Sequence, residues 1–146
     1  MQVAFYKGRT RLFNRVVSWW LNGPYSHGEL VFGTDSDGVS ECASCSFMDD
    51  GVRPKYITLN PEHWDIIEVD GDEAYARAML KKHRNTKYDT FGLLGLVWRR
   101  GKGDPNKLWC TEWIAMALGY EEAWRFDPMV LFVSLKKKSL NESISA

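Results

Sequence analysis

The feature that most constrains the fold is a block of short strand-like segments between residues 25 and 69, separated by turn signals. Asp, Gly, Asn and Pro residues interrupt the block, as they do between antiparallel strands. We therefore predict strands at residues 25–32, 39–47, 52–59 and 64–69, with a further short strand at residues 2–7. Pro54 has no N–H to donate, so the strand at 52–59 is expected at a sheet edge or beside a bulge.

Helical patterns flank this block on both sides. Apolar residues recur at three- and four-residue spacing in residues 9–22, which predicts an amphipathic helix. Further helices are predicted at residues 72–83, 90–98, 110–118 and 127–135. Residues 139–146 are expected to form a flexible tail. The order of helix, antiparallel strands and helices indicates an α+β fold with one domain, residues 1–138.

Composition excludes several classes of protein. Lys plus Arg and Asp plus Glu each number 19, so no global basic field indicates a nucleic-acid partner. The three cysteines are an odd number, which does not suggest a disulfide framework. The N-terminus lacks the pattern of a signal peptide, and no apolar run reaches the roughly 18 residues of a membrane span. We expect a cytoplasmic protein with free thiols.

A cysteine at the start of a helix is the main chemical signal. Trp113, Ile114 and Leu118 fall on one face after Cys110, and Gly119 ends the pattern. Cys110 is therefore predicted in the first turn, where unpaired N–H groups and the helix dipole favour a thiolate. Such a cysteine is a nucleophile if a base can reach it. By position alone, a buried structural cysteine is the more common case.

His27 is the histidine best placed to be that base, because it opens a strand directly after a Gly-Pro break. Strand alternation puts His27, Glu29 and Val31 on one face. Glu41 lies among small and apolar residues on the next strand, where an imidazole would be a suitable partner. A simple hairpin instead places His27 opposite Cys45, so a bulge or wider turn is needed to bring Glu41 alongside. A solvated charge on an edge strand is the alternative for Glu41.

Two other functions compete with a thiol enzyme. Cys42 and Cys45 form a C-x-x-C pair that His27 or Cys110 could extend to a zinc site. Strand alternation points Cys42 and Cys45 to opposite faces, and a second ligand pair is missing. The other alternative is a catalytically silent binding domain, in which some of the seven tryptophans line a cleft.

An ordered set of short motifs carries a family resemblance. The motifs are Tyr25-Ser26-His27, Glu41, Gly51-Val52-Arg53, Tyr88-Asp89 and Trp109-Cys110-Thr111-Glu112. Together they resemble the circularly permuted branch of the NlpC-like papain-fold cysteine peptidases, close to YiiX/YebB-like proteins and distantly related to lecithin retinol acyltransferase. The resemblance covers roughly residues 1–135 and implies a permuted papain-like fold, with a small antiparallel sheet packed on the cysteine helix.

The resemblance also implies residue roles. Cys110 matches the nucleophile, His27 the base and Glu41 the orienting acid. Two positions depart from the family pattern: Gly28 stands where a β-branched residue is common, and Thr111 where serine is common. Neither departure removes a catalytic group.

The reaction implied is cleavage of an amide or ester bond through a thioester, by a hydrolase or acyltransferase without a metal or cofactor. Peptides, including cell-wall peptides, acyl amides and esters are the implied substrates. The backbone N–H of Cys110 is the first expected oxyanion donor and Tyr25 a candidate for the second, although a turn-packing role fits Tyr25 equally well. Glu112 is expected to give electrostatic support at the helix end.

Overall fold

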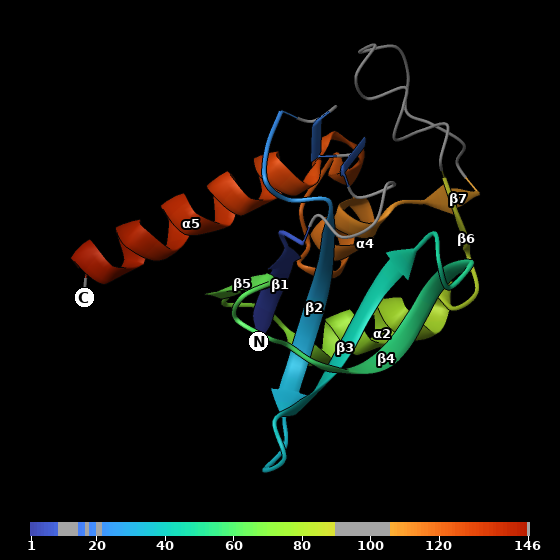
Figure 1. The fold of residues 1–146 in the computed structure, drawn as a ribbon, viewed down its shortest axis with the longest axis horizontal. Helices are drawn as coiled ribbons and strands as arrows, with labels where there is room; N and C mark the ends of the chain where they lie inside the picture. The colour runs from blue at the N-terminus through green and yellow to red at the C-terminus, as the bar shows by residue number, and fades with distance from the viewer. Residues whose placement is uncertain (9–14, 17, 20–21, 90–105, 146) are drawn as a thin grey trace.

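The computed structural model describes residues 1–8, 15–16, 18–19, 22–89 and 106–145 of the chain, and within these residues the fold is α+β (Figure 1). Five antiparallel strands form the main sheet in the order β4-β3-β2-β1-β5. The strands are β1 (Gln2–Tyr6), β2 (His27–Thr34), β3 (Val39–Ser46), β4 (Gly51–Thr58) and β5 (Trp64–Glu68). All five were predicted from the sequence, with ends that differ by at most two residues.

The position of Pro54 confirms the expectation of an edge strand. Pro54 lies in β4, which pairs with β3 on one side and is the last strand of the sheet on the other. A missing N–H at the outer side of an edge strand costs no ladder hydrogen bond. The sequence therefore placed this strand correctly in the sheet.

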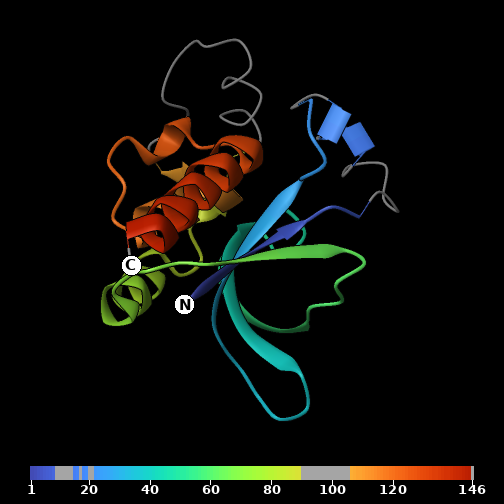
Figure 2. The same cartoon turned by 90° about the vertical axis from the view of Figure 1, so that its left-hand side faces the viewer.

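The helices gather on one side of the sheet, as Figure 2 shows. They are α2 (Glu73–His83), α4 (Cys110–Ala117) and α5 (Pro128–Ser145), with a short 3-10 turn, η1 (Ala123–Arg125). Helix α4 is the central one, because it packs against β2 and β3 and its residues Trp113, Ile114 and Ala115 are fully buried. A Cβ atom on Gly28 would lie 3.1 Å from Ile114 Cδ1. The absence of a side chain at Gly28 thus lets α4 approach β2 closely.

The other face of the sheet carries a second, smaller apolar cluster. Ala4, Val31 and Cys42 are buried there, and Ile57 of β4 and Trp64 of β5 pack against them. Strands β4 and β5 are the two edges of the sheet, so their side chains reach one cluster only because the sheet curves strongly (Figure 2). The curvature makes this face concave.

A short parallel pair links the sheet region to the cysteine helix. Strand β6 (Lys87–Tyr88) pairs with β7 (Lys107–Leu108), and Tyr88 lies opposite Leu108. Because Cys110 follows Leu108 by two residues, this pairing brings Tyr88 beside the start of α4.

The C-terminal helix is longer than expected. The sequence predicts the end of this helix at residue 135 and a flexible tail over residues 139–146, whereas α5 continues to Ser145 (Figure 1). Residues 136–145 contain neither Gly nor Pro, so no residue in them ends a helix. The predicted helix at 90–98 and most of the one at 9–22 lie outside the described residues. In the described parts of the chain, no helix has the length and apolar character needed to cross a membrane.

Candidate active site

Cys110 is the first residue of α4, as the sequence predicts. Cys110 is only 2% exposed. Side-chain hydrogen bonds of the two residues that flank it fix the start of the helix. Thr111 Oγ1 and Trp109 Nε1 both donate to the carbonyl of Phe126, at 2.6 and 3.3 Å. The N–H groups of a first helical turn lack intrahelical acceptors, so those near the sulfur are available to an anion.

His27 joins the thiol to a carboxylate. Its side chain forms a hydrogen bond with Cys110, and its Nε2 lies 2.8 Å from Oε1 of Glu29. Burial lowers the pKa of His27, but the hydrogen bonds to Cys110 and Glu29 outweigh burial and raise the pKa to about 10. The surroundings of the ring therefore favour an imidazolium beside the Glu29 carboxylate.

Glu29, and not Glu41, is the acid beside the imidazole. The Glu29 side chain is 1% exposed, and Arg53 donates to both of its oxygens, at 2.8 and 2.7 Å. Burial opposes ionisation, yet the hydrogen bonds from Arg53 and His27 hold the pKa of Glu29 below its ordinary value. Glu29 is consequently an ionised carboxylate that can orient His27.

The structure does not bring Glu41 to the site. A bulge does occur between β2 and β3, after Val31, but it sets Glu41 opposite Gly33. Gly33 is six positions beyond His27, which is roughly 20 Å along β2. Glu41 instead accepts two hydrogen bonds from Arg77 of α2, at 2.8 and 2.9 Å, on the surface. The expected role of Glu41 beside His27 is therefore corrected.

Tyr25 also differs from its expected role as an oxyanion donor. Its hydroxyl donates to Oδ2 of Asp65 at 2.7 Å, and its ring packs against Phe5 and Phe132. Burial and the Asp65 carboxylate raise the pKa of Tyr25 above its ordinary value. The packing role that the sequence left open for Tyr25 is the one that the structure describes.

Tyr88 is the hydroxyl that lies beside the thiol. It forms a side-chain hydrogen bond with Cys110, and burial together with the nearby thiols raises the pKa of Tyr88 well above its ordinary value. The ring contacts Phe47 edge-on, with 5.9 Å between centroids. The motif Tyr88-Asp89 predicts no role for Tyr88, because the contact of Tyr88 with Cys110 arises only from the pairing of β6 with β7.

A hollow of about 490 Å³ opens on the concave side of the sheet, next to these groups. Its lining includes His27, Glu29, Arg53 and Tyr88, with apolar walls from Phe47, Met48, Ile57 and Trp64. Phe47 and Met48 are 50% and 64% exposed. Cys110 itself does not line the hollow, but His27 and Tyr88, which do, both interact with its thiol.

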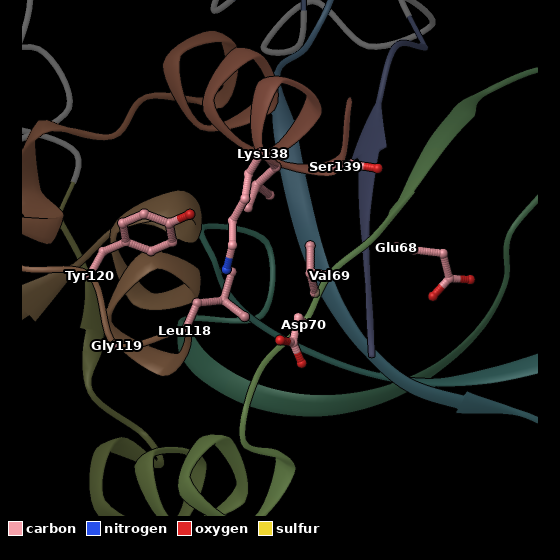
Figure 3. Close-up of a pocket in the computed structure, with 9 residues that line it drawn as sticks. Glu68, Val69, Asp70, Leu118, Gly119, Tyr120, Lys138 and Ser139 are labelled. Carbon is pink, nitrogen blue, oxygen red and sulfur yellow. The ribbon is translucent and has the colours of Figure 1, made fainter. Parts of the chain in front are cut away.

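A second hollow, of about 300 Å³, lies at the opposite end of α4 (Figure 3). Leu118, Gly119 and Tyr120 at the C-terminal end of α4 face Asp70 and Lys138 across it. Because Cys110 is at the N-terminal end of the same helix, this hollow is separate from the thiol site.

The remaining cysteines occupy separate environments. Cys42 is buried in the concave-face cluster, whereas Cys45 is buried in the main core and donates its thiol to the carbonyl of Leu108 at 3.0 Å. The two side chains therefore point to opposite faces of β3, as strand alternation requires. Within the described residues, no three His, Cys, Asp or Glu side chains converge as metal ligands.

Comparison of the chain with protein-family models, curated proteins and solved structures finds no match. The geometry of the described residues is therefore the basis for inferring what the protein does.

Proposed function

We propose that the chain is a cysteine hydrolase or acyltransferase that uses Cys110, His27 and Glu29. The observation that carries the proposal is the position of His27, which contacts the thiol of Cys110 and the carboxylate of Glu29. A nucleophile, a base and a group that orients the base are the three parts of an activated-thiol site.

In the proposed reaction, His27 accepts the proton of the Cys110 thiol, and the thiolate sulfur bonds to an amide or ester carbonyl carbon. The carbonyl electrons move to oxygen, where the N–H of Cys110 and the hydroxyl of Tyr88 stabilise the oxyanion. When the C–N or C–O bond breaks, the imidazolium donates its proton to the departing amine or alcohol. Water or another acceptor then loses a proton to His27 and cleaves the thioester.

The topology supports a permuted papain-like arrangement as part of this proposal. The histidine strand β2 precedes the cysteine helix α4 in the chain, and α4 packs on the sheet that contains β2. This order is the one that the family resemblance implies. Peptides, acyl amides and esters remain the proposed substrates.

A silent binding domain is the second candidate, and the 2% exposure of Cys110 favours it. A domain of this kind would use the hollow beside His27 to hold a ligand without reacting. The two candidates differ in whether an acyl group ever forms a bond to the sulfur.

Acylation with 4-nitrophenyl acetate separates the two candidates. We expect a burst of 4-nitrophenolate and a mass increase of one acetyl group, mapped to the peptide that contains Cys110. Cys110→Ala should abolish both signals, whereas Cys42→Ala, which removes a buried thiol from the second cluster, is the matched control and should retain them. Absence of acetylated Cys110 in the wild-type protein would favour the binding domain.

A further inference from the structure

Arg53 lies between Glu29, the acid of the site, and the wall of the hollow. Its Nη1 and Nη2 atoms donate to the two oxygens of Glu29, at 2.8 and 2.7 Å. Its Nε donates to Oδ2 of Asp49 at 2.7 Å, and the Arg53 side chain is only 14% exposed. The guanidinium is thus shared between two carboxylates in a largely buried position.

Glu29 needs a permanent counter-charge to act on His27. A carboxylate that is 1% exposed is costly to keep ionised without a partner, and it would otherwise take up a proton. His27 contacts one oxygen of Glu29, whereas Arg53 contacts both. The paired contact therefore supplies the charge and also fixes the plane of the carboxylate, so that Oε1 faces Nε2.

Arginine is the residue type that this arrangement requires. A guanidinium stays charged at all relevant pH values and offers donors in a rigid fork, whereas a lysine ammonium is a point charge that cannot fix a carboxylate plane. The third nitrogen, Nε, donates to Asp49, which lies in the turn that follows β3 and also accepts from Lys55 at 3.0 Å. Phe47 and Met48 of the same turn line the hollow.

We infer that Arg53 is a positioning residue for the proposed reaction: it keeps Glu29 charged and oriented, and through Glu29 it aligns His27 with the thiol of Cys110. The inference rests on the proposed function. It assigns a role to Arg53, for which the sequence motif Gly51-Val52-Arg53 predicts none. Arg53 acts through Glu29 and does not touch the reacting sulfur.

The test is the pH dependence of carbamidomethylation of Cys110 by iodoacetamide, followed by peptide mass spectrometry. Arg53→Lys and Arg53→Gln should react at least tenfold more slowly than wild type near pH 6.5, where the thiolate needs the imidazolium. Near pH 9.5 the rates should converge, because hydroxide can then remove the thiol proton without help from the imidazolium. A purely structural defect would instead change access to the sulfur at both pH values.

Asp49→Asn is the matched control, because it removes the other ion pair of Arg53 and leaves the contacts between Arg53 and Glu29 in place. Its pH profile should follow that of wild type. In a Glu29→Gln background, adding Arg53→Gln should slow the reaction at pH 6.5 by less than twofold, because residues that act through one another are not additive. The double variant also removes both buried charges, so it remains informative if Arg53→Gln alone does not fold.

Overlapping profiles for wild type and both Arg53 variants would overturn the inference while leaving the proposed function intact. An equal shift in Asp49→Asn would also overturn it, because the effect would then belong to the turn and not to Glu29. A wild-type Cys110 that reacts no faster than Cys42 at pH 6.5 would overturn the proposed function and this inference together.

Discussion

His27 and Glu29 are separated by one residue on β2, and their side chains meet on the same face, with 2.8 Å between Nε2 and Oε1. Alternation along a strand makes this contact local: residues i and i+2 point the same way. The base and the acid that orients it are therefore set by one strand, and their contact does not depend on the register of the hairpin. The hydrogen bond to Nε2 leaves Nδ1 as the nitrogen for the thiol.

The first prediction compares the two glutamates. Glu29→Gln should slow acylation of Cys110 by about 10²-fold or more, because the amide lacks the charge that stabilises the imidazolium. Glu41→Gln should leave the rate within about twofold, because Glu41 pairs with Arg77 on the surface. Burst kinetics with 4-nitrophenyl acetate, with circular dichroism to verify folding, measure both variants.

The reverse result would restore the assignment made from the sequence. If Glu41→Gln lost activity and Glu29→Gln retained it, the acid would have to reach His27 in an arrangement that differs from the described one. His27→Ala gives the lowest activity expected in this comparison, since removal of the base should abolish nearly all turnover.

The second prediction concerns the selectivity of thiol labelling. Burial is the main cause that raises the pKa of Cys42 to about 12, and burial likewise raises the pKa of Cys45 above its ordinary value. Both thiols should therefore remain protonated and unreactive at pH 7, whereas Cys110 has a base and a helix N-terminus beside it. Brief iodoacetamide treatment and mass spectrometry should find Cys110 modified first. Labelling of Cys45 before Cys110 would contradict this order.

The strands could be predicted because their signals are local. Turn residues and Pro54 mark the limits of the segments and the edge of the sheet, and these depend on a few neighbouring residues. The end of α5 could not be located, because a run of polar residues without Gly or Pro is compatible with either a tail or a helix. The curvature of the sheet depends on packing between its two edges, which no single segment reveals.

The site residues also fall into two groups, those that local patterns predict and those that depend on contacts between distant segments. Cys110 at a helix start and His27 at a strand start follow from local patterns, and the sequence placed both correctly. The environment of Glu41 and its match to the family motif predicted Glu41 as the orienting acid. Strand alternation, however, already places Glu29 on the same face as His27. The roles of Tyr88 and Arg53 depend on contacts between distant segments, such as the pairing of β6 with β7, so residue type alone could not predict them.

The third prediction tests the oxyanion donor. Tyr88→Phe keeps the ring and its edge contact with Phe47 but removes the hydroxyl that bonds to Cys110. Loss of one such donor typically costs about 10²- to 10³-fold in turnover, so acylation should slow by about this factor. Tyr25→Phe is the matched control, because the Tyr25 hydroxyl is bonded to Asp65 and should not affect the rate. Wild-type acylation kinetics in Tyr88→Phe would contradict this role for Tyr88. The backbone N–H of Cys110 would then be the one proposed oxyanion donor that remains.

The fourth prediction concerns Glu112, a residue that is 8% exposed and whose carboxyl accepts a hydrogen bond from the N–H of Trp109 at 3.4 Å. Burial, with a smaller effect of Asp89, raises the pKa of Glu112 to about 7, although the Trp109 N–H opposes this shift. An acid with a raised pKa binds more protons in the folded state than in the unfolded state. The contribution of Glu112 to the free energy of unfolding should therefore fall as pH rises from about 4.5 to about 7 and level off above that.

Glu112→Gln removes this titration while keeping an oxygen that can accept from Trp109. We expect the variant to gain on the order of 1–3 kcal/mol relative to wild type at pH 8, and little or nothing at pH 4.5. Urea unfolding at the two pH values measures the difference, and Glu62→Gln on the exposed surface serves as the control. Turnover should change less than in Glu29→Gln, because Glu112 contacts the helix end and not His27. A Glu112→Gln protein whose stability relative to wild type is the same at both pH values would show that this carboxyl does not titrate in the window.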